Sequence, residues 1–245
     1  MGRDPRLNMS EFFLELFSEE IPPKLQINAR KTILSDINNY LEENDIKIKG
    51  LVSALSTPNR IIINFSNISK EVIKKSQEIR GPSINAKTEA LEGFLKSHNI
   101  KKSQVKLKST EKGEFYFYKT LEQKLKTYDL LRENLPSILD KINWNKSMKW
   151  GNNQMFWGRP LKSILAVFDG RKIDFNFYHL KASNFTFLDK DFEEKKKNFN
   201  NFQSYQSYFK SIKIIINQDK RKEFINNELN KISKKNNLLI DLKES

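Results

Sequence analysis

An apolar run near the start of the chain, 11–17 (EFFLELF), is followed within a few residues by two adjacent prolines, Pro22 and Pro23. Short runs rich in Phe and Leu are typical of buried strands. Adjacent prolines are not tolerated inside a sheet or a helix, because proline lacks the backbone N–H and has a fixed φ. The chain must turn here, so we expect a buried strand that leads into a helix. The residues 24–44 fit that helix, because apolar side chains recur every four positions: Leu25, Ala29, Ile33, Ile37 and Leu41.

The rest of the chain mixes strand and helix signals without a regular βαβ alternation. The turn signals 57–59 (TPN) and 111–114 (EKGE) separate β-prone runs and predict two hairpins, and 80–82 (RGP) predicts a break. Helical spacing predicts helices over 86–97, 128–142 and 219–235. Further strands are expected over 161–168, 173–178, 212–216 and 238–242. This pattern favours the α+β class, with mixed or antiparallel sheets and packed helices.

The charge of the chain is uneven, and it suggests two sub-domains. The chain carries 44 Lys and Arg against 30 Asp and Glu, a net charge of +14. Residues 1–100 hold 14 basic and 13 acidic residues, so residues 101–245 hold 30 and 17. We expect an extension over 1–8, an α+β sub-domain over 9–100, and a basic α+β sub-domain over 101–245 that is cut short at its C-terminal end. A regional basic excess points to an anionic partner. The competing interpretation is a solvated, lysine-rich surface.

Missing residue types exclude several kinds of chemistry. The chain has no cysteine, which excludes disulfides, Cys-ligated zinc and iron–sulfur clusters. It has two histidines, His98 and His179, so a multi-histidine metal site is not expected. No apolar run approaches the roughly 20 residues that span a bilayer, and no signal peptide is evident at the N-terminus. We therefore expect a cytoplasmic protein without a membrane partner.

Two carboxylates after the first strand, Glu19 and Glu20, are the candidates for acid/base chemistry. The simpler interpretation is that Ser18 caps a helix and that the glutamates favour its positive end. The chain contains no G-x-x-x-x-G-K-[ST], G-x-G-x-x-G or G-x-S-x-G motif. We predict no catalytic, cofactor-binding or metal-binding residue in this chain.

A basic and aromatic cluster is the stronger signal. Within 17 residues the chain places Lys146, Lys149, Trp150, Trp157, Arg159 and Lys162. Aromatic rings that stack on bases, beside cations that contact phosphates, are typical of surfaces for single-stranded RNA. The alternative is that both tryptophans belong to the core, because tryptophan is mostly buried. Arg80, in 80–82 (RGP), either contacts a phosphate or binds a neighbouring carbonyl. The predicted RNA contacts are Arg80, Lys149, Arg159 and Lys162.

An ordered set of motifs resembles one protein family. The motifs are, in chain order, 12–23 (FFLELFSEEIPP), 56–60 (STPNR), 80–82 (RGP), 92–94 (EGF), 112–114 (KGE), 148–151 (MKWG), Arg159-Pro160 and 208–222. Together they resemble the N-terminal region of the β subunit of bacterial glycyl-tRNA synthetase. Asn59 differs from the family, which has an arginine there, and 186–192 (TFLDKDF) replaces a T-R-G-H-R-F stretch. The family's β subunit is also much longer, with further helical and anticodon-binding domains.

The resemblance implies a subunit of a glycine–tRNA ligase, which attaches glycine to tRNA(Gly) with ATP. In that family the active site, with ATP and Mg²⁺, lies in the separate α subunit. The β subunit binds tRNA and completes an assembly of two α and two β subunits, so the implied partners are the α subunit and tRNA(Gly). The alternative is a stand-alone, non-enzymatic RNA- or protein-binding module. A catalyst built on Glu19 and Glu20 is disfavoured, because no partner groups accompany them.

Overall fold

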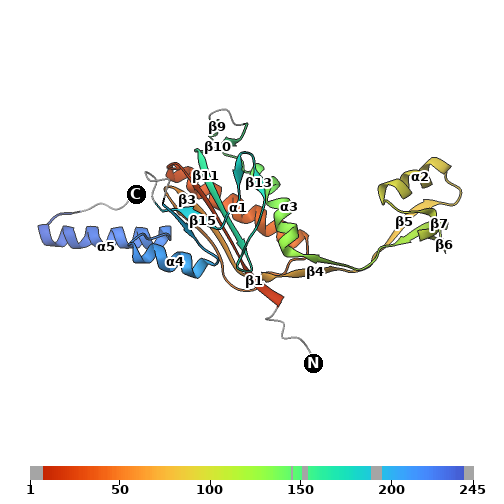
Figure 1. The fold of residues 1–245 in the computed structure, drawn as a ribbon, viewed down its shortest axis with the longest axis horizontal. Helices are drawn as coiled ribbons and strands as arrows, with labels where there is room; N and C mark the ends of the chain where they lie inside the picture. Colours follow the sequence, from red (N-terminus) through yellow and green to blue (C-terminus); the bar gives the residue numbers. More distant parts are fainter. Residues whose placement is uncertain (1–7, 145, 151–153, 189–194, 240–245) are drawn as a thin grey trace, which may run out of the picture. The chain divides into compact units, whose positions relative to one another are not determined.

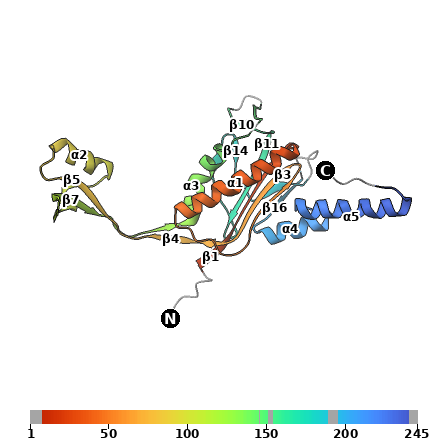
Figure 2. The ribbon, with the colours of Figure 1, turned by 180° about the vertical axis from the view of Figure 1, so that it is seen from behind.

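The computed structural model of the chain describes residues 8–144, 146–150, 154–188 and 195–239. The chain divides into two compact units. We call Met1–Lys70 together with Lys126–Ser245 the main unit, and Glu71–Leu125 the inserted unit. The ribbon is shown from two sides in Figures 1 and 2.

The main unit contains most of the helices and strands. Its N-terminal elements are β1 (Met9–Ser18), α1 (Pro23–Glu43), β2 (Val52–Thr57) and β3 (Arg60–Ser69). After the inserted unit, the chain continues with α3 (Thr127–Asp140), β9 (Met148–Lys149), β10 (Phe156–Trp157), β11 (Leu161–Phe168), β12 (Arg171–Lys172), β13 (Asn176–Phe177), β14 (Leu180–Lys181), β15 (Phe185–Phe187), β16 (Lys196–Asn198), α4 (Phe202–Ser211) and α5 (Gln218–Asn236).

A five-stranded sheet forms the centre of the main unit. Its strand order is β12-β11-β1-β3-β2, and each neighbouring pair is antiparallel. β1 is the middle strand, and its residues 12–18 are all buried. Because both faces of β1 are covered, its sequence is a continuous apolar run rather than an alternating one. The predicted buried strand is confirmed.

Helix α1 packs against β2 and β3 and lies across the sheet in Figure 2. Its buried residues include four of the apolar positions predicted to share one face: Ala29, Ile33, Ile37 and Leu41. The helix begins at Pro23, and no side chain caps it. Ser18 ends β1, and its hydroxyl donates to the Glu19 carbonyl at 2.9 Å. The predicted Ser18 cap is therefore wrong, because the prolines already fix the turn into the helix.

An aromatic layer covers the sheet on the side of α4. Tyr205 of α4 lies at its centre, with its ring 4.9 Å from that of Phe13 on β1 and 4.5 Å from that of Phe209. The buried cluster around it also contains Leu55, Ile62, Leu165, Val167, Phe199, Phe202 and Ile216. Aromatic pairs at these separations add to the hydrophobic stabilisation from area burial. This layer joins the C-terminal helices to the strands at the start of the chain.

A charged pair is enclosed by this aromatic layer. Glu15 on β1 is fully buried, and its Oε2 lies 3.4 Å from Nε of Arg60 on β3. The Tyr205 hydroxyl donates to the same carboxylate oxygen. Burial raises the pKa of Glu15, and the positive charge of Arg60 opposes that rise. Burial and the charge of Glu15 raise the pKa of Tyr205 well above 10, so the phenol keeps the proton that it donates.

Arg60 connects this pair to further elements. Its guanidinium donates to the Phe187 carbonyl of β15. It also lies over two rings, at 4.5 Å from the Phe17 centroid and 4.9 Å from the Phe209 centroid. Cation–π contacts are strongest where the cation is desolvated, as it is here. The carboxylate–guanidinium pair therefore fixes β1, β3, β15 and α4 to one another.

The helices 128–142 and 219–235 are confirmed as α3 and α5, but the last predicted strands are not. The isoleucine-rich segment 212–216 forms the turn between α4 and α5, with Lys213 at φ +62°. Ile216 is instead buried against the aromatic layer, so tertiary burial overrides the β-propensity of this run. Leu238 and Leu239 are not in a strand, and 240–242 lies outside the described residues. Of the predicted strand 173–178, only β13 (Asn176–Phe177) forms a strand.

The inserted unit is a small α+β element. It contains β4 (Glu71–Lys74), β5 (Glu78–Ser83), α2 (Thr88–Ser97), a 3-10 turn (Lys102–Gln104), β6 (Val105–Thr110), β7 (Gly113–Lys119) and β8 (Gln123–Lys126). β5, β7 and β6 form an antiparallel sheet, and β4 pairs with β8. The predicted break at 80–82 lies inside the edge strand β5, where the register shifts between Arg80 and Ser83. Pro82 is tolerated there because it lies on an edge strand, at an irregular point.

The two units do not coincide with the predicted sub-domains 9–100 and 101–245. A boundary at residue 100 would separate β5 from β7, although the two strands pair. It would also separate β1 from β11, which pair in the central sheet. The difference arises because strand pairing joins segments that are distant in sequence, and regional charge does not report that pairing. The predicted α+β class is confirmed, with antiparallel sheets and packed helices. No helix among the described residues has the length and apolar character needed to cross a membrane.

The buried pair generates a stability prediction. We expect Glu15→Ala to lower the free energy of unfolding by about 3–5 kcal/mol, because Arg60 would stay buried without its carboxylate. Tyr205→Phe removes one hydrogen bond to Glu15 and should cost about 1–3 kcal/mol. Urea unfolding measures both. The control is Lys231→Ala, which breaks an exposed ion pair with Glu228 and should change stability by at most about 1 kcal/mol. Equal stability of Glu15→Ala and the unaltered chain would contradict the structural role of the pair.

Candidate nucleic-acid interface

Three of the motif segments meet at one end of the central sheet. The segment after β1 donates its backbone N–H groups to the other two segments: Ser18 to the Asn59 carbonyl at 2.8 Å, Ile21 to the Pro58 carbonyl at 2.7 Å, and Glu19 to the Pro160 carbonyl at 2.9 Å. We call this meeting point the motif junction. It consists of the S-E-E-I-P segment, the T-P-N turn between β2 and β3, and the Arg159-Pro160 entry into β11.

Two predicted RNA contacts, Arg159 and Lys162, belong to the motif junction. Nε of Arg159 donates to the Glu20 carbonyl at 3.1 Å, and Nζ of Lys162 lies 2.6 Å from Oε1 of Glu19. The Lys162 side chain is only 20 % exposed, so most of it is shielded from a large ligand. Both cations therefore hold the turn between β1 and α1. The structure brings these two residues together and gives each a protein partner.

Glu19 has a structural role at the same place. Its backbone N–H and its carboxylate both bind the segment 160–162. No group of three or more His, Asp or Glu side chains within the described ranges is arranged to hold a metal ion. The Glu19 carboxylate and the Glu20 carbonyl therefore anchor the turn through Lys162 and Arg159. The simpler interpretation, in which both glutamates lie at the positive end of a helix, is wrong, because the first turn of α1 contains no acidic residue.

Lys149 lies on a separate, more exposed hairpin. β9 and β10 pair through Phe156↔Lys149 and Trp157↔Met148. Nζ of Lys149 lies 5.1 Å from the centroid of the Phe156 ring, and Phe156 is 57 % exposed. An exposed ring beside an exposed cation is the arrangement that stacks on a base and contacts its phosphate. The sequence cluster did not include Phe156; its place opposite Lys149 is the signal that identifies it.

The tryptophans belong mainly to the core of the main unit. Trp157 is fully buried, with its ring 5.0 Å from that of Trp144 and 5.7 Å from that of Phe177. Trp150 is half-buried, and its Nε1 donates to the Trp157 carbonyl at 3.0 Å. The alternative interpretation of the tryptophans as core residues is therefore correct for Trp157, and Trp150 is held in place by the backbone.

Arg80 lies in the inserted unit and is not part of the motif junction. Its guanidinium carbon lies 3.5 Å from the centroid of the Phe115 ring on β7. The residue is exposed on the edge strand β5. Arg80 is therefore a surface cation that stacks on an aromatic ring. Arg80 and Lys149 contact rings, whereas Arg159 and Lys162 bind the turn between β1 and α1.

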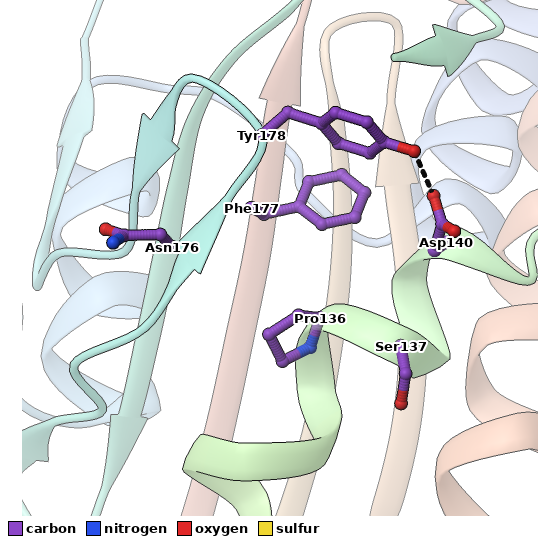
Figure 3. Close-up of a pocket in the computed structure, with 6 residues that line it drawn as sticks. All are labelled: Pro136, Ser137, Asp140, Asn176, Phe177 and Tyr178. Atoms are coloured by element: carbon purple, nitrogen blue, oxygen red, sulfur yellow. Dashed lines mark hydrogen bonds between the residues drawn. The ribbon is translucent and has the colours of Figure 1, made fainter. Parts of the chain in front are cut away.

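A small hollow of about 260 Å³ lies between α3 and the β13–β14 hairpin (Figure 3). The hydroxyl of Tyr178 donates to Oδ1 of Asp140 at 2.6 Å across it, and this hydrogen bond raises the pKa of Tyr178. Tyr178 has a left-handed φ of +51°, which the two-residue turn of the hairpin requires. This hydrogen bond joins the β13–β14 hairpin to α3. Because the two polar groups bind each other, we assign them a structural role and not a role as an acid/base pair.

Sequence reasoning missed the residues that determine the interior of the main unit. Glu15 and Arg60 are the clearest case, since both are buried and paired although they are charged. A carboxylate in the middle of the apolar run 11–17 was the available signal. Its partner was not predictable, because only the pairing of β1 with β3 and the packing of α4 bring Arg60 and Tyr205 to it.

The close contact between Gly158, which precedes Arg159, and the Trp144 ring generates a packing prediction. A side-chain carbon at Gly158 would lie 2.4 Å from the nearest atom of the Trp144 ring, which is too close for any real contact. We expect Gly158→Ala to lower the free energy of unfolding by about 1–3 kcal/mol and to alter the tryptophan fluorescence, because the ring must shift. Gly93→Ala is the control, since nothing lies within 4 Å of a carbon added there. It should stabilise α2 slightly through better helix propensity. Unchanged stability of Gly158→Ala would contradict the tight contact.

Comparison with known proteins places these segments in a family. A family model described as the glycyl-tRNA synthetase beta subunit matches residues 12–245. The chain is 36 % identical over 234 residues to the glycine–tRNA ligase beta subunit of Rickettsia canadensis (strain McKiel), covering 95 % of this chain and 34 % of that protein. It is 34 % identical over 232 residues to the corresponding subunit of Rickettsia prowazekii (strain Madrid E), with 95 % and 35 % covered.

The chain thus spans about a third of the length of these relatives. The match contains all of the motif segments, including the three that meet at the motif junction. Ordered motifs and the family model lead to the same result, which is that this chain belongs to the glycyl-tRNA synthetase β subunit family.

Proposed function

We propose that this chain acts as the N-terminal part of the β subunit of a glycine–tRNA ligase. In this role it supports the ATP-dependent attachment of glycine to tRNA(Gly) by binding the tRNA and docking the α subunit. The observation that carries the proposal is the match of the family model over residues 12–245. The relatives are named as glycine–tRNA ligase beta subunits, and a beta subunit acts together with another subunit.

The chemistry of the reaction is assigned to the α subunit in this proposal. ATP and Mg²⁺ would bind there, in an assembly of two α and two β subunits in the cytoplasm. Two buried or paired carboxylates are in keeping with this division: Glu15 is enclosed with Arg60, and Glu19 is paired with Lys162. Both carboxylates hold the fold, and the role proposed for this chain is to supply binding surface.

The predicted RNA contacts of the main unit have different roles in tRNA binding, which follow from their surroundings. Lys149 is the best placed to contact a phosphate, because it lies on an exposed hairpin beside the exposed ring of Phe156. Arg159 and Lys162 present a positive charge at the motif junction while they hold Glu20 and Glu19. The net charge of +14 on the whole chain supplies the long-range attraction for an RNA polyanion.

A salt titration of tRNA binding tests this proposal. We expect Lys149→Ala to weaken binding of tRNA(Gly) and to lower the slope of log Kd against log salt by about 1. The triple variant Lys149→Ala/Arg159→Ala/Lys162→Ala should lower the slope further, by a total of about 2, because most of the Lys162 side chain is shielded. Lys47→Ala, an exposed lysine in the loop between α1 and β2, removes the same charge as Lys149→Ala and serves as the control. Gel shift at several salt concentrations measures the slopes.

Capture of the α subunit tests the other half of the proposal. An immobilised form of this chain should retain the α subunit, and thermal unfolding of each variant checks that its fold is intact. If the chain binds neither tRNA(Gly) nor the α subunit, the proposed function is overturned. Binding of RNA without capture of the α subunit would favour a stand-alone RNA-binding module instead.

A further inference from the structure

The three-stranded sheet of the inserted unit has two unlike faces. Alternating residues along its strands place Ile79, Val105, Leu107, Tyr116 and Tyr118 on one face, as the paired positions show. Helix α2 packs on this face. The ring of His98, at the end of α2, lies 6.3 Å from that of Tyr118 and 4.8 Å from that of Phe94. Phe94 in turn lies against Gly81, where a side-chain carbon would meet its ring at 2.9 Å. One face is therefore partly covered by α2.

The opposite face carries two phenylalanines surrounded by cations. Phe115 and Phe117 occupy the central strand β7, and both are half-buried. Phe117 is paired with Arg80 on β5 and with Lys106 on β6, and Phe115 is paired with Lys108. We call this surface the open face. It consists of Glu78, Arg80, Lys106, Lys108, Phe115, Phe117 and Lys119.

The contacts on the open face keep the rings beside positive charge. The Arg80 guanidinium carbon lies 3.5 Å from the Phe115 centroid, and Nζ of Lys108 lies 5.6 Å from the Phe117 centroid. Lys108 also pairs with Glu78, the one carboxylate of this face, at 2.5 Å. Four cations therefore accompany one acidic side chain. All residues of the inserted unit are described, and its one α-helix packs on the other face.

This composition is unusual for the solvent face of an antiparallel sheet. Such a face normally carries polar side chains, while the apolar residues face the core. Phe115 and Phe117 lie on the face that α2 does not cover, and both stay half-buried there. The Phe117 ring offers a flat stacking surface, and the guanidinium plane of Arg80, which rests on the Phe115 ring, offers a second. A sheet with aromatic rings on its middle strand and cations around them is suited to unpaired bases and their phosphates.

We propose that the open face binds unpaired nucleotides of RNA. Bases stack on Phe117 and on the outer plane of the Arg80 guanidinium, which itself lies on the Phe115 ring, while Lys106 and Lys119 contact the phosphates. An acidic protein surface would match the cations but would leave the two central rings without flat partners, so the observations favour RNA. The inference rests on the proposed function, because it specifies where the chain contacts unpaired segments of its tRNA.

Anisotropy of a fluorescein-labelled oligocytidine, titrated with the full chain at several salt concentrations, tests this inference. The variant Phe115→Leu/Phe117→Leu keeps apolar side chains but removes the ring faces. We expect it to weaken binding about tenfold or more, because each stacked base contributes substantially to affinity. Lys106→Ala/Lys119→Ala should lower the slope of log Kd against log salt by about 1.4, since each phosphate contact on a single strand accounts for about 0.7.

A matched control removes the same charge from elsewhere in the inserted unit. Lys96→Ala/Lys112→Ala alters the last turn of α2 and the β6–β7 turn, and should leave both affinity and slope unchanged. Equal losses in the control and in Lys106→Ala/Lys119→Ala would overturn the site in favour of general electrostatic attraction. Unchanged affinity of a folded Phe115→Leu/Phe117→Leu variant would overturn the stacking. Loss of α-subunit capture with unchanged RNA binding would identify the open face as a protein interface instead.

Crosslinking of the unaltered chain keeps the test independent of variants that fail to fold. Ultraviolet irradiation of the complex with oligocytidine should attach nucleotides to the tryptic peptide 113–119 (GEFYFYK). Crosslinks confined to other peptides would overturn the inference. If the chain binds tRNA(Gly) but not the unpaired oligonucleotide, the open face is excluded while the proposed function stands. If it binds neither RNA, both the open face and the tRNA-binding role are overturned.

Discussion

The enclosed contact between Glu15 and Arg60 is the interaction on which the main unit depends. A buried carboxylate and a buried guanidinium are costly to remove from water, and here their opposite charges, 3.4 Å apart, offset part of that cost. Their requirement for each other fixes the register of β1 against β3. Tyr205 extends the contact to α4, and the Phe187 carbonyl extends it to β15. The aromatic layer then excludes water from the pair and stabilises the sheet through burial of apolar area.

The motif junction shows how distant segments come to act as one unit. The turn between β1 and α1 has its N–H groups bound by carbonyls of two other segments, and Lys162 and Arg159 hold Glu19 and the Glu20 carbonyl. Each segment alone is a short and weakly informative motif. Their order along the chain is informative because antiparallel pairing of β1 with β3 and β11 brings all three to the same end of the sheet. The family assignment and the geometry therefore support each other.

Two surfaces combine a cation with an aromatic ring, and the charge count did not separate them. On the main unit, Lys149 lies beside the exposed ring of Phe156. On the inserted unit, Arg80 lies on the ring of Phe115, among three lysines of the same face. In both places a cation and an aromatic ring adjoin across a strand pair. Regional charge pointed to residues 101–245, whereas the open face combines β5, which precedes residue 100, with β6 and β7, which follow it.

Local sequence patterns predicted most of the helices and strands, and the ordered motifs indicated the family. Continuous apolar character identified β1, four-residue spacing identified the buried face of α1, and the turn segments 57–59 (TPN) and 111–114 (EKGE) identified the β2–β3 and β6–β7 hairpins. These signals depend only on neighbouring residues. The tertiary structure alone decided the division into units, the partner of Glu15, the protein contacts of Lys162 and Arg159, and the irregular path of 212–216. Each of these depends on contacts between residues far apart in the chain, and such contacts leave no periodic signal in the sequence.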